Sequence, residues 1–282
     1  MHMSRIAAAA LALVLLSRPS AAQQRPLVTE DPEPIGAGRV LIEAGVDSAR
    51  KVRYPASGLT GNLWRMPTIG ISIGLSSIAE LQIDGGPFNR LSITNRASGP
   101  LRDLMTATGA TTSDVEDIVV ATKIRMVQET GSHPSFSMRF ATKLPNAENE
   151  SGLGTDTTDF YASLLSGMTV QSLRLVGNVG VGILADPVQG NRQNDVLTYG
   201  ASVARALTDH AEMVGELNGR VSTRAGGPFP GTETRGRLNL GGRYTHGPVR
   251  FDGSVFVGLT SIDPTIGFSA GLTYVFNAFN VP

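Results

Sequence analysis

The side chains most able to do chemistry in this sequence are basic ones that recur at alternate positions. Lys123 and Arg125 show this spacing, and Arg235 and Arg237 repeat it further along the chain. Side chains two residues apart share one face of a β-strand. Rows of arginine and lysine along a pore wall attract anions and reject cations. The spacing therefore favours a wall that admits small anionic or polar solutes, carboxylated aromatics included.

Other charged residues fall on the same predicted face, and bases outnumber acids there. The predicted basic residues are Lys123, Arg125, Arg139, Lys143, Arg174, Arg220, Arg235, Arg237, Arg243 and Arg250. The acids predicted to oppose them are Glu80, Asp84, Glu129, Asp159, Glu216 and Asp252. Two outcomes are open, because these charges could line a conducting lumen or pair across it and plug it. The long segment 89–114 could fold inward as a constriction or remain an outer loop.

Apolar residues occupy the positions between the charged ones, so the elements that carry the charges must be strands. Phe136, Met138 and Phe140 alternate with Ser137 and Arg139, which is a period of two and not the 3.6 of a helix. The same alternation predicts about twelve strands, near 39–49, 65–75, 79–88, 118–127, 136–143, 159–168, 173–183, 195–207, 213–221, 237–244, 249–259 and 266–276. We predict an all-β, antiparallel transmembrane β-barrel.

The predicted connections are short and long by turns. The tight ones lie near 76–77, 132–133, 169–171, 208–210 and 246–248, and the longer ones near 47–64, 89–114, 145–157, 185–194, 225–232 and 260–265. Outer-membrane barrels have short periplasmic turns and longer extracellular loops. An even strand number puts both termini on one side, which we assign to the periplasm.

A soluble β-sandwich or lipocalin-like barrel is the alternative fold, with its apolar face pointing inward. About twelve strands are too many for a small sandwich, and the polar faces mix charges with many of the 33 glycines. The chain has 24 basic and 24 acidic residues, so it shows no basic patch for nucleic acid. It has no cysteine, which excludes disulfides and thiolate metal sites.

Four regions are expected along the chain. Residues 1–22 have the pattern of a secretory signal peptide, with Arg5 before an apolar run and small residues before Gln23. Residues 23–37 form a periplasmic N-terminal segment, whose Glu30-Asp31-Pro32-Glu33 run we interpret as a solvated tether. Residues 38–276 form the barrel and 277–282 a C-terminal tail. The expected location is the outer membrane of a Gram-negative cell, among its lipids and lipopolysaccharide.

The last predicted strand resembles the C-terminal β-signal that the outer-membrane assembly machinery reads. Gly271, Tyr274 and Phe276 give the glycine and the spaced aromatic residues, although six residues follow Phe276. From about Val119 onward the chain also resembles the outer-membrane barrel family called MetA-pathway of phenol degradation. The motifs are Lys143-Leu144-Pro145, Gly152-Leu153-Gly154-Thr155-Asp156, Asn178-Val179-Gly180, Gly215-Glu216 and the closing Gly271 to Phe276. This resemblance implies an outer-membrane barrel and a passive route for small, often aromatic, compounds.

Two other classes of function are open. Some outer-membrane barrels are lipid hydrolases that need a serine beside a histidine. Here His133, His210 and His246 fall in the tight turns, and no Gly-x-Ser-x-Gly motif occurs, so we do not expect an enzyme. Asp156 and Asp159 are too few for a Ca²⁺ site, and we expect no metal or cofactor. The other class is a non-conducting structural or receptor barrel.

Overall fold

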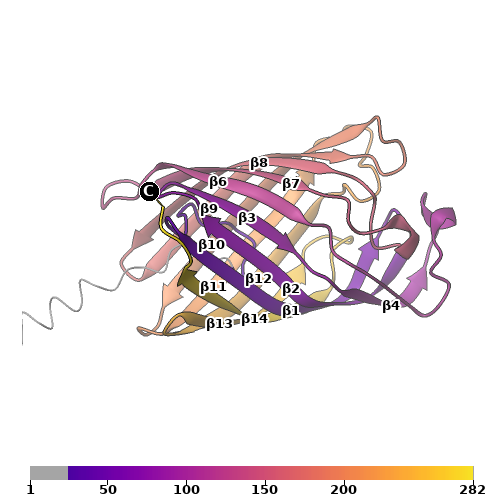
Figure 1. The fold of residues 1–282 in the computed structure, drawn as a ribbon. Coiled ribbons are helices and arrows are strands. Elements are labelled where there is room, and N and C mark those ends of the chain that lie inside the picture. The colour runs from indigo at the N-terminus through magenta and orange to yellow at the C-terminus, as the bar shows by residue number, and fades with distance from the viewer. Residues whose placement is uncertain (1–24, 282) are drawn as a thin grey trace, which may run out of the picture.

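One antiparallel sheet closes on itself to form the molecule (Figure 1). The computed structural model describes residues 25–281, so the predicted signal peptide lies outside the described residues. The described part contains no helix that is long and apolar enough to cross a membrane. The barrel closes because β1 pairs with β14 from Arg39↔Asn277 to Arg50↔Ile266.

Fourteen strands make up the sheet, with two short 3-10 turns between them. The strands are β1 Arg39–Tyr54, β2 Leu59–Gly74, β3 Ala79–Gly85, β4 Asn89–Arg96, β5 Thr111–Asp114, β6 Val119–Val127, β7 Ser135–Lys143, β8 Asp159–Val170, β9 Leu173–Ala185, β10 Gln193–Ala206, β11 Ala211–Ser222, β12 Arg235–His246, β13 Val249–Gly258 and β14 Ile266–Asn277. The 3-10 turns are η1 Arg102–Leu104 and η2 Asn149–Ser151.

These fourteen strands give twelve positions around the barrel. One half of β2 pairs with β3 and the other half with β4, so β3 and β4 are two pieces of one long strand. They are separated at Gly86-Pro87, where the proline has no N–H to give to the ladder. In the same way β6 pairs with β3 and β5 with β4. The prediction of a closed antiparallel barrel of about twelve strands is confirmed.

The outer surface is apolar and the inner surface is polar. Met126 is 63% exposed and Leu240 62%, whereas Lys123 and Thr273 have no exposed surface. Aromatic side chains pack against each other on the outside, as in the edge-to-face contact of Trp64 with Phe268. A soluble barrel would have the opposite arrangement, so this surface is one that faces lipid.

The two ends of the barrel differ. At one end, here called the turn end, five connections are short, namely 75–78, 128–134, 171–172, 207–210 and 247–248. At the other, the loop end, the connections are 55–58, 97–110, 144–158, 186–192, 223–234 and 259–265. The C-terminus lies at the turn end (Figure 1).

Two expected loops contain strand residues. The predicted connection 47–64 shrinks to 55–58, because β1 and β2 stay paired as far as Tyr54↔Leu59. The ends of segment 89–114 form β4 and β5, which extend the wall at the loop end (Figure 1), and residues 97–110 between them remain a connection at that end. Leu91, on β4, is fully buried in an apolar cluster with Leu59 and Leu63. The residue composition of segment 89–114 does not predict this inward apolar cluster, because the cluster depends on the pairing of β4 with β2.

Candidate functional site in the barrel lumen

Residues 25–38 lie inside the barrel and are here called the N-terminal segment. Thr29 and Glu30 are each 5% exposed and Ile35 is 2% exposed. The expectation that Glu30-Asp31-Pro32-Glu33 is a solvated tether is therefore wrong. The physical reason is charge. Three of these four residues are acids, and they lie beside basic side chains of the wall that attract them into the lumen.

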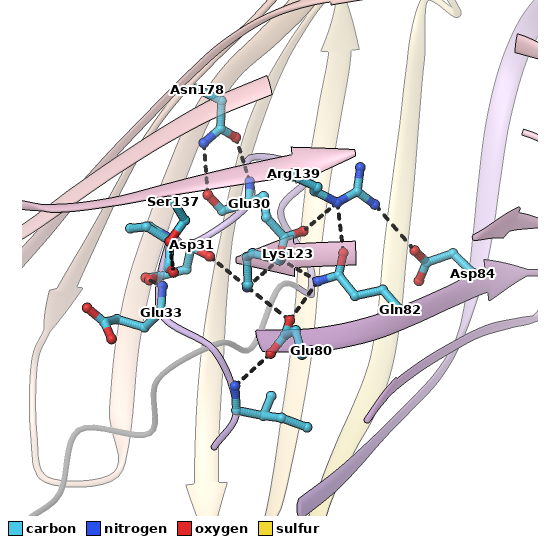
Figure 2. Close-up of polar contacts among 12 residues, drawn as sticks. Glu30, Asp31, Glu33, Glu80, Gln82, Asp84, Lys123, Ser137, Arg139 and Asn178 are labelled. Atoms are coloured by element: carbon cyan, nitrogen blue, oxygen red, sulfur yellow. Dashed lines mark hydrogen bonds and ion pairs between the residues drawn. The ribbon is translucent and has the colours of Figure 1, made fainter. Parts of the chain in front are cut away.

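Glu30 enters a buried cluster of charges on the inner wall (Figure 2). Its carboxylate lies 2.8 Å from the Lys123 Nζ and accepts a hydrogen bond of 2.7 Å from Gln82. The same ammonium lies 3.0 Å from Glu80 and donates to the Asp31 carbonyl at 2.8 Å. A buried charge is costly unless it is paired and hydrogen-bonded. The Lys123 ammonium has two hydrogen-bond acceptors and a second carboxylate beside it, so this condition is met.

The other two acids of the N-terminal segment also meet arginines. Arg174 holds Asp31 with two parallel hydrogen bonds of 2.9 and 2.7 Å. Arg125 reaches Glu33 at 2.5 Å. Two-pronged arginine–carboxylate contacts are strong and fix geometry as well as charge. The segment therefore supplies acidic partners to wall cations in addition to the acids predicted on the wall itself.

The wall also holds the backbone of the N-terminal segment. Glu216 accepts hydrogen bonds from the N–H groups of Val28 and Thr29. Asn178 accepts from the Glu30 N–H at 2.7 Å and donates to its carbonyl at 2.8 Å. Further contacts join Ser137 to the Pro32 carbonyl, Glu80 to the Ile35 N–H and Asn239 to the Pro26 carbonyl. The segment is therefore held by side chains on six strands, β3, β6, β7, β9, β11 and β12, and not by pairing with one neighbouring strand.

Arg25 fixes the start of the N-terminal segment. Its guanidinium donates to Thr68 at 2.9 Å and to Ser269 at 2.8 Å, and it lies 3.5 Å from Asp252. A Cβ on Gly45 would come within 2.3 Å of this guanidinium, and one on Gly271 within 2.5 Å. Glycine is used where another group must approach the backbone closely. Gly200 and Gly167 leave similar space for Thr29 and Pro32.

The structure divides the predicted wall residues into three groups. Those that contact the N-terminal segment are Lys123, Arg125, Arg139, Arg174, Glu216, Arg243 and Asp252. Lys143 pairs instead with Asp117 at 2.8 Å and Asp159 at 3.3 Å, and the buried Arg250 donates to Thr245. Arg220, Arg235 and Arg237 line open space.

Among the predicted β-signal residues, Tyr274 and Phe276 stack on each other, with ring centroids 5.5 Å apart. Arg25 and Arg65 were not predicted as lumen residues, although both point inward. Arg65 lies just before Met66-Pro67, where the register with β1 shifts and the inward face of the strand changes parity. The inward position of Arg25 depends on the segment entering the lumen.

Open space remains between the N-terminal segment and the loop end. Two adjoining cavities of about 480 Å³ each share Val28, Arg65, Arg139, Tyr161 and Arg237 in their linings. Val28 is 55% exposed and forms part of the floor. Arg65 is neutralised by Asp47 at 3.1 Å and Glu116 at 2.7 Å, and Arg139 lies 3.8 Å from both Glu30 and Asp84. The lumen is thus filled near the turn end and hollow beyond the segment.

Side chains also hold the connections at the loop end together. Arg192 contacts Asp186 at 2.6 Å and lies over the Phe229 ring, 4.6 Å from its centroid. Burial alone would raise the pKa of Asp186, but hydrogen bonds from the Val188 N–H and from Arg192 outweigh it and lower that pKa. Within residues 25–281 no group of three or more His, Asp or Glu side chains is placed to hold a metal ion.

The lipid-facing surface and the closed sheet define an outer-membrane β-barrel. The structure is similar to the COG4313 outer membrane channel from Pseudomonas putida F1, with a TM-score of 0.56, 12% identity, and coverage of 87% of this chain and 98% of that one. A fainter similarity joins it to the Pseudomonas putida toluene transporter TodX, with a TM-score of 0.43, 9% identity, and coverage of 92% and 96%. No family model and no curated protein matches the sequence. The chain is therefore placed in the outer membrane by its fold.

Proposed function

We propose that this protein is a passive outer-membrane channel for small anionic solutes, and that its N-terminal segment narrows the lumen. The observation that carries the proposal is the hollow lumen, whose wall presents Arg220, Arg235 and Arg237. A converging positive field raises the local concentration of anions. The turn end then faces the periplasm and the loop end the exterior, as is usual for barrels with short and long connections. The proposed function includes no enzymatic activity.

The ion pairs of the N-terminal segment favour a second candidate, a barrel that does not conduct. Glu30, Asp31 and Glu33 each have a basic partner on the wall. If the segment stays in place and leaves no path beside it, the barrel does not conduct and serves as a structural or receptor protein. Conductance separates the two candidates directly.

The test compares the full chain with the variant Glu30→Gln/Asp31→Asn/Glu33→Gln in planar bilayers. The neutral side chains remove the acid that pairs with Arg125 and one of the two acids at each of Lys123 and Arg174. Breaking a buried pair in this way costs several kcal/mol, so we expect the segment to detach. We expect small, anion-selective steps from the full chain and steps several-fold larger from the variant. The control Asp103→Asn/Glu148→Gln/Glu150→Gln removes three exposed acids at the loop end and should behave like the full chain. Absence of steps from all three proteins, with no liposome swelling by small anions, would leave the non-conducting barrel.

A further inference from the structure

Within the part of the chain that the structure describes, three neighbouring arginines on the inner wall have no acid in ion-pair contact. Arg220 and Arg235 lie directly opposite each other on β11 and β12, and Arg237 follows two residues later on the same face. Among residues 25–281, none of the three has a carboxylate oxygen within 4 Å, unlike Arg65, Arg125 and Arg174. Like charges directly opposite each other across two strands are unfavourable. An anion held between them would remove this repulsion.

The hydrogen bonds of these arginines leave donors free for a ligand. Arg220 donates to the backbone carbonyls of Gly231 and Glu233 and also hydrogen-bonds the Tyr161 side chain, whereas Arg235 makes one long contact of 3.5 Å with the Arg53 carbonyl. Arg237 lies over the Phe256 ring, 4.2 Å from its centroid. Asp263, an acid in the lining of the adjoining cavity, accepts instead from Gly236 and Thr260.

An apolar surface faces the three arginines. Ala49, Val52 and Leu63 belong to the buried cluster on β1 and β2, with Tyr54 packed against it. These four residues and the three arginines line one cavity of about 350 Å³. This volume is within the usual range for small-molecule sites, roughly 300–1,000 Å³, which combine an apolar lining with a few convergent polar groups. One side of the cavity suits a carboxylate and the other an apolar body.

We propose that Arg220, Arg235 and Arg237 bind a small organic carboxylate with an apolar body, such as an aromatic acid. Guanidinium groups match a carboxylate with paired hydrogen bonds, and the apolar cluster covers the ring. The inference rests on the proposed channel, because it names the solute class that the lumen would take up. It places recognition at the loop end, before the N-terminal segment is reached.

The test is calorimetric titration of the refolded full chain in detergent with benzoate, benzyl alcohol and acetate. We expect benzoate to bind about tenfold more tightly than benzyl alcohol, which lacks the charge, and than acetate, which lacks the ring. Arg235→Gln/Arg237→Gln should weaken benzoate binding about tenfold or more, and Arg237→Lys should weaken it less, because lysine keeps the charge and loses the paired geometry. Arg90→Gln, an exposed arginine on β4, should leave it unchanged.

Heat-modifiable migration on a gel verifies that every variant is folded. Equal binding of benzoate and benzyl alcohol, or an unchanged affinity in both Arg235→Gln/Arg237→Gln and Arg237→Lys, would overturn the site. The outcome is separable from that of the channel proposal. Conductance without benzoate binding would contradict this site and support the channel. Benzoate binding without conductance would contradict the channel and support the site.

Discussion

At the scale of single residues, Lys123 is the central cation of the lumen. It is fully buried and lies within 3.0 Å of two carboxylates, one from the N-terminal segment and one from β3. Lys123→Met would remove the counter-charge of the buried Glu80 and leave Glu30 with only the more distant Arg139, 3.8 Å away. Breaking a buried pair by removing one partner costs about 3–5 kcal/mol. We expect the free energy of unfolding to fall by about that amount in urea titrations of the protein in lipid vesicles.

The control for this substitution is Lys51→Met, at an exposed lysine of β1. Surface substitutions of this kind change stability by about 0.5 kcal/mol or less. Trp64, the single tryptophan, packs on Phe268 at the outer surface and gives a fluorescence signal for unfolding. Equal unfolding curves for the two variants would show that the Lys123 cluster adds nothing to stability.

Gly200 tests whether the wall is shaped for the N-terminal segment. A Cβ at this position would lie 2.7 Å from the Thr29 Oγ1 and 3.3 Å from its Cγ2. Gly200→Ala should therefore push Thr29 away and loosen its hydrogen bond with Glu216. We expect faster cleavage of the folded, detergent-solubilised protein after Glu30 by a glutamate-specific protease, followed by mass spectrometry.

A second substitution that relieves the clash tests whether the clash causes the faster cleavage. Thr29→Gly in the Gly200→Ala chain removes the clashing side chain, and the cleavage rate should return toward that of the parent if the clash is the only cause. Gly177→Ala on β9 serves as the matched glycine control, because nothing lies within 4 Å of its Cβ position. A Gly200→Ala protein cleaved as slowly as Gly177→Ala would contradict a fitted wall.

At the scale of the elements, the strands could be predicted far better than the N-terminal segment. Alternation along β6 to β14 is a local property, so the inward charges and outward apolar residues followed from spacing alone. The segment has no such period. Its burial depends on matches between Glu30, Asp31 and Glu33 and cations roughly a hundred residues away in sequence, a pairing that no local pattern contains.

The early strands show the same limit. β2 changes its inward parity between Arg65 and Thr68, and β1 shifts register with β2 between Ala49 and Val52. A shift of one residue exchanges the two faces of a strand. Arg65 and the apolar cluster were missed for this reason, and with them one side of the cavity that faces Arg237.

At the scale of the whole molecule, charge is arranged along the barrel axis. Near the turn end the acids of the N-terminal segment neutralise Lys123, Arg125 and Arg174. Farther toward the loop end Arg220, Arg235 and Arg237 face open space, and no acid of the described part of the chain lies within 4 Å of them. An anion entering from the loop end would meet these unneutralised arginines before the segment. The direction of this gradient in a cell depends on which end faces outward.

Cysteine labelling decides that orientation, because the chain contains no cysteine of its own. Gly131 lies in a connection at the turn end and Gly190 in one at the loop end, and no atom lies within 4 Å of the Cβ position of either. Both Gly131→Cys and Gly190→Cys should therefore fold normally. In intact Gram-negative cells, a large membrane-impermeant maleimide should label Gly190→Cys and spare Gly131→Cys until the outer membrane is permeabilised. The reverse pattern would turn the barrel around, so that solutes from outside would reach the N-terminal segment before the arginines.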